Sequence, residues 1–159
     1  MSQAIPTRPR SVGVVKRHFP IVASQFNQAY VQGLVDHFTG ELRNLAPAAT
    51  LTLHQVPGAF EIPVIVRELA SQRRGDAIIA MGVILKGETD HGEHLARSVT
   101  DALQRIAVSY GTPVLNVVLS FDSETQAQER CLEDEINRGT EAARAAIEIT
   151  NLMSKLRNK

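Results

Sequence analysis

An uninterrupted apolar segment, residues 77–85, is the feature that most constrains what this chain can fold into. A strand that is apolar on both faces is typical of the centre of a parallel sheet, because helices cover both sides of such a sheet. Two more apolar segments, at 20–24 and 114–119, and a weakly alternating segment at 50–56 predict the remaining strands.

Between the predicted strands, apolar residues recur at spacings of three and four, as in helices that pack one face against a core. The clearest stripe consists of Val31, Leu34, Val35, Phe38, Leu42 and Leu45. The elements therefore alternate as βαβαβαβα, which predicts an α/β fold: a three-layer αβα sandwich on a four-stranded parallel sheet with right-handed connections. We expect residues 1–10 to form a flexible arm and residues 11–159 a single domain, because 159 residues suit one core.

The composition excludes several classes of function. Seventeen basic residues balance seventeen acidic ones, so charge provides no case for nucleic acid or an anionic membrane as the main partner. No segment approaches the roughly 18 consecutive apolar residues of a membrane helix, and the N-terminal apolar stretch is too short for a secretion signal. Cys131 is the only cysteine, which excludes an intrachain disulfide framework and a cysteine-based zinc site. We therefore expect a cytoplasmic protein.

Ligands of parallel α/β sheets bind outside the carboxyl ends of the strands, which here lead into segments 25–27, 56–61, 86–94 and 120–123. Segment 86–94 has the glycine spacing of a phosphate loop, but Glu88 stands where a nucleotide-binding loop needs lysine, so nucleoside triphosphate binding is not expected. Phosphate can still bind free backbone N–H groups near Glu88 and Thr89 at the start of the next helix. Asp90 with Glu93 predicts an acidic capping box, so a merely well-capped helix is the alternative interpretation.

His91, at this predicted helix start, is a candidate acid–base group, because an ordinary histidine pKa near 6.5 suits proton transfer at neutral pH. On its position alone, an exposed surface histidine is an equally good interpretation. His91 and His94 supply at most half of a zinc site, since zinc needs three or four ligands and no other histidine has a matching spacing.

Three further side chains each have two interpretations. Phe26, in the turn after the first strand, either stacks on a planar ligand ring or covers the edge of the sheet. Glu61 either accepts hydrogen bonds from substrate hydroxyls or complements the dipole of its helix. Arg130, taken alone, is a solvated charge on a helix.

Four motifs that occur in order favour the functional interpretation of these residues: Phe26-Asn27, residues 56–63 (VPGAFEIP), residues 87–91 (GETDH), and Glu129-Arg130 with residues 137–139 (NRG). Together they resemble the lumazine synthase family, from about residue 21 to residue 153. The resemblance implies a flavodoxin-like sheet and pentamers with active sites between neighbouring subunits. It implies no metal and no organic cofactor, and functional coupling to riboflavin synthase.

The activity implied by the resemblance is the penultimate step of riboflavin biosynthesis. In that step 5-amino-6-ribitylaminouracil condenses with 3,4-dihydroxy-2-butanone 4-phosphate to give 6,7-dimethyl-8-ribityllumazine, with release of phosphate and water. Carried over by position, His91 is the proton-transfer histidine, and Glu88, Thr89 and Arg130 bind phosphate. The residues expected to hold the pyrimidine and the ribityl chain are Phe26, Ala59, Phe60, Glu61, Val83, Ile84, Leu85 and Asn116.

This sequence departs from the family pattern at three places. Gly92 and Glu93 follow His91, where the family usually has an aromatic residue and an aspartate. Asn116 replaces a phenylalanine that in many relatives covers the pyrimidine from the adjacent subunit, so hydrogen bonding is expected there in place of stacking. Arg138 replaces a lysine near the phosphate and keeps its charge. Two alternatives stay open: a flavin-binding or shell-forming protein without catalysis, and a generic phosphosugar-binding domain.

The assembly is also expected to differ from that of the shell-forming relatives. Those relatives have a small, glycine-rich, basic link between the last two helices, whereas here the link contains Glu133, Asp134 and Glu135. Like charges repeated by symmetry repel one another unless they are paired, and Arg138 and Arg144 are the nearby candidates for pairing. We therefore expect a pentamer, or at most two pentamers, in place of a sixty-subunit shell.

Overall fold

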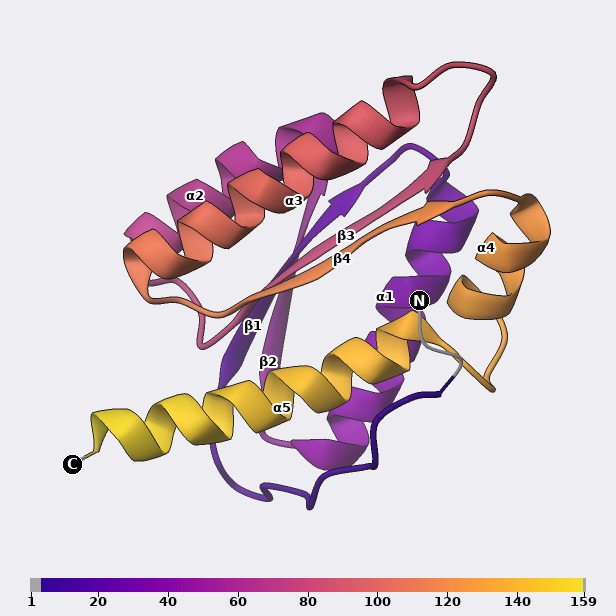
Figure 1. Ribbon diagram of the computed structural model, residues 1–159. Coiled ribbons are helices and arrows are strands. Elements are labelled where there is room, and N and C mark those ends of the chain that lie inside the picture. Colours follow the sequence, from indigo (N-terminus) through magenta and orange to yellow (C-terminus); the bar gives the residue numbers. More distant parts are fainter. Residues whose placement is uncertain (1–3, 159) are drawn as a thin grey trace.

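The computed structural model describes residues 4–158 and contains one sheet of four parallel strands between two layers of helices (Figure 1). The strands, in the spatial order β2-β1-β3-β4, are β1 (His18–Ser24), β2 (Thr50–Val56), β3 (Ile78–Leu85) and β4 (Val114–Phe121). The helices are α1 (Gln28–Leu45), the short 3₁₀ helix η1 (Ala59–Glu61), α2 (Ile62–Ser71), α3 (His91–Tyr110), α4 (Glu124–Cys131) and α5 (Arg138–Arg157). The flavodoxin-like three-layer sandwich predicted from the sequence is confirmed.

The core lies on both faces of the sheet. Helices α1, α4 and α5 cover one face and α2 and α3 cover the other (Figure 1). Strand β3 is buried along all but its last residue, as expected for a central parallel strand. On α1, the six residues of the predicted apolar stripe are the six buried residues of the helix, which confirms that stripe.

Two glycines let α1 approach its neighbours closely. A Cβ added to Gly33 would collide with the carbonyl oxygen of Cys131, at the end of α4. A Cβ added to Gly139 would collide with the carbonyl oxygen of Leu34, where α5 crosses α1. The face formed by α1, α4 and α5 is therefore packed with backbone against backbone.

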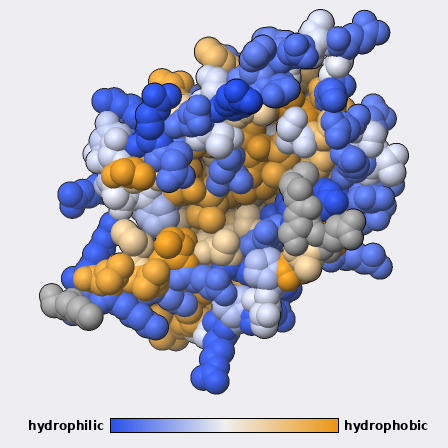
Figure 2. Space-filling model, in the orientation of Figure 1, coloured by the Kyte–Doolittle hydropathy of each residue, from blue (hydrophilic) through white to orange (hydrophobic). Residues whose placement is uncertain are grey.

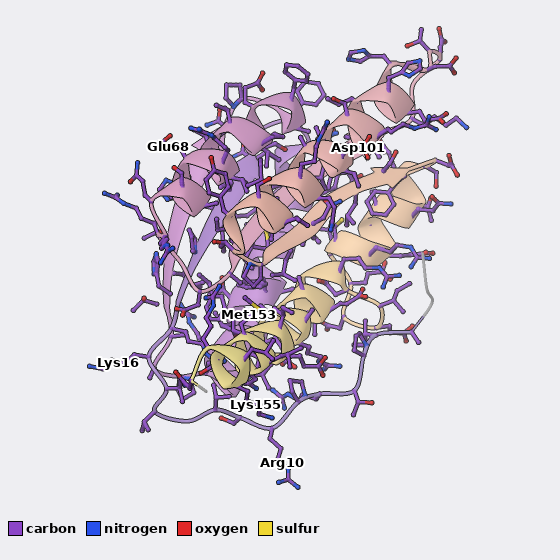
Figure 3. All side chains as sticks on the ribbon, turned by 60° about the vertical axis from the view of Figure 1, so that its left-hand side comes forward. Arg10, Lys16, Glu68, Asp101, Met153 and Lys155 are labelled. Carbon is purple, nitrogen blue, oxygen red and sulfur yellow. The ribbon has the colours of Figure 1, made fainter. Side chains whose placement is uncertain are left out.

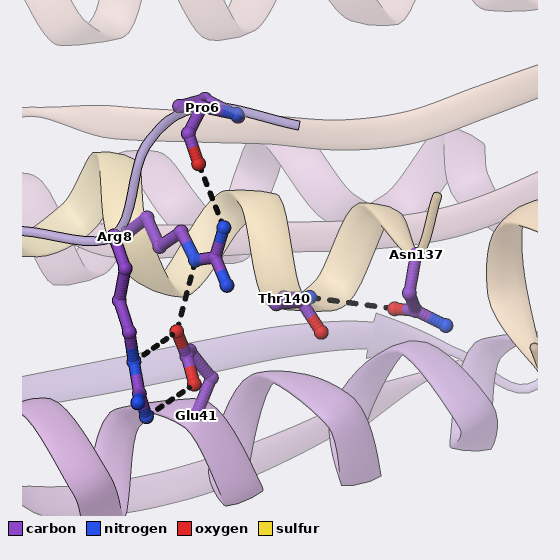
Figure 4. A network of polar contacts seen from close by, with 6 residues as sticks. Pro6, Arg8, Glu41, Asn137 and Thr140 are labelled. Carbon is purple, nitrogen blue, oxygen red and sulfur yellow. Dashed lines mark hydrogen bonds and ion pairs between the residues drawn. The ribbon is translucent and has the colours of Figure 1, made fainter. Parts of the chain in front are cut away.

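The N-terminal segment is joined to this face by a polar network (Figure 4). The Glu41 carboxylate on α1 accepts two bonds from Arg8, at 3.0 and 2.9 Å, and one from Nε of Arg144 on α5, at 2.9 Å. Arg144 also donates to the carbonyl of Pro6 at 2.7 Å. Residues 1–3 of the predicted arm lie outside the described residues.

Two local predictions need correction. The first strand begins at His18, two residues before Pro20. Proline is tolerated there because residues 18–20 pair only with β2, and pairing with β3 begins at Ile21. The Asp90 side chain makes no capping bond, so the predicted acidic capping box at α3 does not form.

Ser123 and Gln126, at the start of α4, have the spacing of a capping box, which forms only in part. Ser123 accepts the bond from the backbone N–H of Gln126, at 3.3 Å, but the Gln126 side chain accepts from the backbone N–H of Asp122 instead of Ser123. Within residues 4–158, none of the helices combines the length and the apolar character needed to cross a membrane.

Candidate active site

A cleft of about 410 Å³ opens at the carboxyl ends of β1 and β3. These two strands are neighbours in the sheet although β2 lies between them in sequence, so the strand order reverses there. Crevices at such switch points are the usual ligand sites of doubly wound sheets. The cleft is lined from the loop after β1, from η1, from the end of β3 and from the first turn of α3.

Two aromatic side chains line this cleft and remain largely exposed. Phe26 is 72% exposed and Phe60 is 70% exposed. Large apolar rings left in solvent beside a cavity are available to stack on a planar ligand. Ala59, which directly precedes Phe60, is buried and anchors η1 in the core.

The loop carrying Phe26 is fixed by the residue that follows it. Asn27 has φ of +54°, a left-handed conformation that asparagine tolerates better than most residues. Its side-chain amide donates to the carbonyl of Val83 at 2.8 Å, which ties the loop after β1 to the end of β3. The Ser24 hydroxyl donates to the Phe26 carbonyl at 3.4 Å. Phe26 is thereby held over the carboxyl end of the central strand.

The opposite wall of the cleft is the start of α3. Thr89 and Gly87 line it, and among the described residues no side chain caps the N-terminus of this helix. Uncapped N–H groups at a helix N-terminus attract anions, and the failure of Asp90 to cap leaves them available. Glu88 is exposed just outside the lining.

His91, the first residue of α3, is exposed and lines the cleft. Within the described part of the chain, it is the only titratable side chain that does so. The next residue, Gly92, also lines the cleft, and a Cβ there would lie 3.3 Å from Cγ2 of Ile84. The absence of a side chain at position 92 therefore keeps the space beside His91 open. His94, one turn further on, does not line the cleft.

The structure brings together most of the residues predicted for the site. Those that line the cleft are Phe26, Ala59, Phe60, Val83, Ile84, Leu85, Thr89 and His91. Sequence reasoning did not assign roles to six residues that also line it: Ser24, Asn27, Gly58, Gly87, Gly92 and Leu95. All but Ser24 and Leu95 lie in the segments that follow the predicted strands. Ser24 was predicted as a strand residue and Leu95 as a helix residue.

Four predicted residues lie outside the cleft. Glu61 folds back so that its Oε2 accepts from the N–H of Gly58 at 2.9 Å, and Glu88 is exposed and does not line the cleft. Asn116 lies on the edge strand β4, where its amide donates to the Thr100 hydroxyl at 3.1 Å and accepts from the N–H of Val118 at 3.0 Å. Arg130 lies half-buried near the end of α4.

Asn116 lines a second hollow, a groove of about 270 Å³ between β4 and α5. Apolar residues gather in the middle of the face between α3 and α5, where β4 runs (Figure 2). The lining residues of this groove include Leu115, Val117, Leu119, Ala142 and Ala145. The edge of the sheet thus presents an apolar surface beside Asn116.

Comparison with known proteins relates this chain to one family over nearly its whole length. The family described as 6,7-dimethyl-8-ribityllumazine synthase matches residues 16–154. The chain is 36% identical over 151 residues to the 6,7-dimethyl-8-ribityllumazine synthase of Halorhodospira halophila, an alignment that covers 94% of this chain and 97% of the relative. It is 36% identical over 138 residues to the protein of the same name from Chromobacterium violaceum, covering 86% of each.

Proposed function

Because the chain belongs to the 6,7-dimethyl-8-ribityllumazine synthase family, we propose that it is a transferase of riboflavin biosynthesis that makes this lumazine. Its substrates are 5-amino-6-ribitylaminouracil and 3,4-dihydroxy-2-butanone 4-phosphate, and its reaction is the penultimate step of the pathway. The proposed location is the cytoplasm.

The observation that carries this proposal is the composition of the cleft at the end of β1 and β3. It combines two exposed aromatic rings, an uncapped helix N-terminus and a single histidine within one cavity of about 410 Å³. These are the groups needed by a planar pyrimidine, a phosphate and a proton transfer, respectively. A generic phosphosugar domain explains the helix N-terminus but not the two rings.

The pyrimidine would stack on Phe26, with its edge facing the backbone of Val83, Ile84 and Leu85. The bond from Asn27 to Val83 supports this role, because it fixes the distance between the stacking ring and the strand end. The ribityl chain would extend along η1, past Ala59 and Phe60. Glu61 can still accept a hydroxyl hydrogen bond through Oε1, since only Oε2 is engaged by Gly58.

In the chemical steps, the amine of the pyrimidine attacks the ketone, and loss of water forms an imine. Phosphate then leaves with the electron pair of its C–O bond while an adjacent carbon loses a proton, which gives an enol that tautomerises to a ketone. The ribitylamino nitrogen attacks this ketone, and loss of a second water closes the ring. His91 would move these protons, and the N–H groups near Glu88 and Thr89 would hold the leaving phosphate. Holding the two reactants together should supply much of the acceleration.

Two of the assigned residues would come from a neighbouring subunit. Neither Asn116 nor Arg130 lines the cleft of its own chain, whereas Asn116 borders the exposed apolar groove at the edge of the sheet. A neighbour seated against that edge would bring Asn116 and Arg130 toward a cleft, with the Arg130 guanidinium against the phosphate. We therefore propose pentamers with active sites between subunits, and functional coupling of this assembly to riboflavin synthase.

Assembly beyond the pentamer would be limited by the link between α4 and α5. Glu133, Asp134 and Glu135 are all exposed, and Arg144, a candidate to neutralise them, is engaged by Glu41. Light scattering should give about 87 kDa, five times 17.4 kDa, or about twice that value. Particles near 1 MDa at physiological salt would show that the acidic link does not prevent shell closure.

The activity itself is tested by incubating the purified protein with both substrates and following the fluorescence of the lumazine product. We expect turnover above the rate of the uncatalysed reaction, and none above that rate when either substrate is omitted. Protein that carries a bound yellow flavin but does not accelerate product formation would instead support the non-catalytic, flavin-binding interpretation.

A further inference from the structure

A hollow of about 250 Å³ lies at the opposite end of the sheet from the cleft, between the segment that enters β1 and the last turns of α5. Figure 3 labels Lys16 on the entering segment and Met153 on α5, two of its lining residues. Because β1 begins at His18, this is the amino end of the strands. The hollow shares no lining residue with the proposed active site.

Arg17 lines this hollow, and only 8% of its surface is exposed. Its Nη2 donates to the side-chain oxygen of Asn151 at 2.7 Å, but Nη1 is buried and bonded to nothing among residues 4–158. Burial lowers the pKa of this guanidinium, and the charge of Asp76 opposes the change. A buried guanidinium with an unbonded nitrogen is costly, so an anion bound beside Nη1 of Arg17 would be strongly favoured.

The charges around the hollow match that requirement. Lys16, Arg17 and Arg157 line it together with a single carboxylate, Asp76, so two positive charges are in excess. The Asp76 Oδ2 is occupied by the backbone N–H of His18, at 2.8 Å. The negative pole of α5 also points to this end and opposes an anion, but Lys155 and Arg157 in its last turn offset that pole.

We propose that this hollow binds a phosphate dianion, either inorganic phosphate or the phosphate of a small ester. Arg17 is the buried anchor, with Lys16 and Arg157 at the exposed rim. Arg157 donates one Nη2 bond to the Gly111 carbonyl and keeps further donors for the ligand. Met153 and Val15 form an apolar wall beside the charged groups, where the organic part of an ester would lie. The site is independent of the proposed catalytic function.

Calorimetric titration with inorganic phosphate, at constant ionic strength, tests the proposal. We expect two phosphate sites per chain in the natural protein and one in Arg130→Gln, in which the proposed catalytic phosphate contact is weakened. Arg17→Met on the Arg130→Gln background should weaken the remaining site at least about tenfold, as expected for loss of a charge-assisted hydrogen bond. Two sites of unchanged affinity in Arg17→Met alone would overturn the proposal, whereas failure of Arg130→Gln to remove a site would count only against the catalytic assignment.

A second variant covers the case in which Arg17→Met does not fold. Lys16 and Arg157 are exposed, so the pair Lys16→Gln and Arg157→Gln should fold and still weaken the site about fivefold to tenfold. Lys155→Gln is the matched control, because Lys155 is exposed on the same helix end but does not line the hollow. If the pair and the Lys155→Gln control weakened phosphate binding equally, the effect would come from the overall surface charge, and the proposed site would be overturned.

Ribose 5-phosphate distinguishes the two sources of the dianion. If ribose 5-phosphate binds the Arg17 site more tightly than inorganic phosphate does, the natural ligand is an ester. If it binds equally or more weakly, the natural ligand is inorganic phosphate. A crystal grown in phosphate that shows only water beside Arg17 would overturn both.

Discussion

Helices α3 and α5 are both 20 residues long, but they relate to the sheet differently. Seven residues of α5 are buried, whereas α3 buries only Val99 and Leu103. Helix α5 also contacts the backbone of α1 at Gly139 and is joined to it through Arg144 and Glu41. Helix α3 packs mainly on the sheet and on α2 and η1, and its first turn is exposed.

This difference separates stability from function. Burial of apolar side chains is the main source of folding free energy, so the face of α1, α4 and α5 should dominate the stability of the subunit. The first turn of α3 buries little apolar surface, and because this turn is exposed, its N–H groups and His91 are available to a ligand. Substitutions at the start of α3 should therefore change catalysis alone, and substitutions on the buried face of α5 should change stability alone.

The largest expected effect is that of His91→Ala. If His91 transfers protons, kcat should fall about 10²- to 10⁴-fold, while the free energy of unfolding changes by less than about 0.5 kcal/mol because the side chain is exposed. Single-turnover fluorescence and urea denaturation measure the two quantities. His94→Ala is the matched control, since it removes an exposed histidine of the same turn that does not line the cleft. An unchanged kcat in folded His91→Ala would remove this residue from the mechanism.

Arg130→Ala should weaken binding of the sugar phosphate by about 1.5–3 kcal/mol and leave pyrimidine binding nearly unchanged, because only the former carries the dianion. Helix α4 belongs to the packed face, so Arg130 would be a contribution of that face to function, which the proposed assembly places across a subunit boundary. Separate titrations with each substrate measure it, with Arg97→Ala on α3 as a control for the loss of a surface cation. Equal weakening of both substrates would contradict the assignment.

Gly139→Ala should lower the free energy of unfolding by about 1–3 kcal/mol, because its Cβ would collide with the Leu34 carbonyl and force α1 and α5 apart. The turnover number of the folded fraction should not change. Gly40→Ala, within α1 and with open space around its Cβ, should have the opposite sign and stabilise by up to about 1 kcal/mol. If both variants proved equally stable, α5 would not be as tightly packed as the structure indicates.

The same division decides how much could be predicted from the sequence. Where many apolar residues repeat with one period, as along α1, the sequence determines which face is buried, and all six predicted positions were right. Along α3, Leu95 and Ile106 have the same spacing as Val99 and Leu103 but are only half-buried, because no second layer covers that side.

The site was predictable in its segments but not in its contacts. Strand ends marked the loops that contain Phe26, Phe60 and His91, since topology alone brings such loops together. Which side chain bonds to which group depends on rotamers that no pattern reports. Asn27 bonds to Val83, and Asp90 leaves its helix uncapped, although both residue types suit several roles.

The last expected effect depends on pH and belongs to the interior of the packed face, at Cys131. Burial raises the pKa of its thiol from 9.0 to about 12, so the folded chain keeps the thiol neutral while the unfolded chain ionises it above pH 9. Ionisation stabilises only the unfolded state in this window, and stability is therefore lost as the pH rises from 9 toward 12. At pH 10 the loss is about 1.4 kcal/mol, because this pH lies one unit above the unfolded pKa.

Cys131→Ala removes the titrating group, although it also leaves a small cavity that lowers stability at every pH. The quantity to compare is thus the decrease in unfolding free energy between pH 8 and pH 10, measured by urea denaturation. That decrease should be larger in the natural protein than in Cys131→Ala by about 1.4 kcal/mol. Equal decreases would mean that the thiol ionises as readily in the folded chain as in the unfolded one, and that the contact between α4 and α1 opens to solvent.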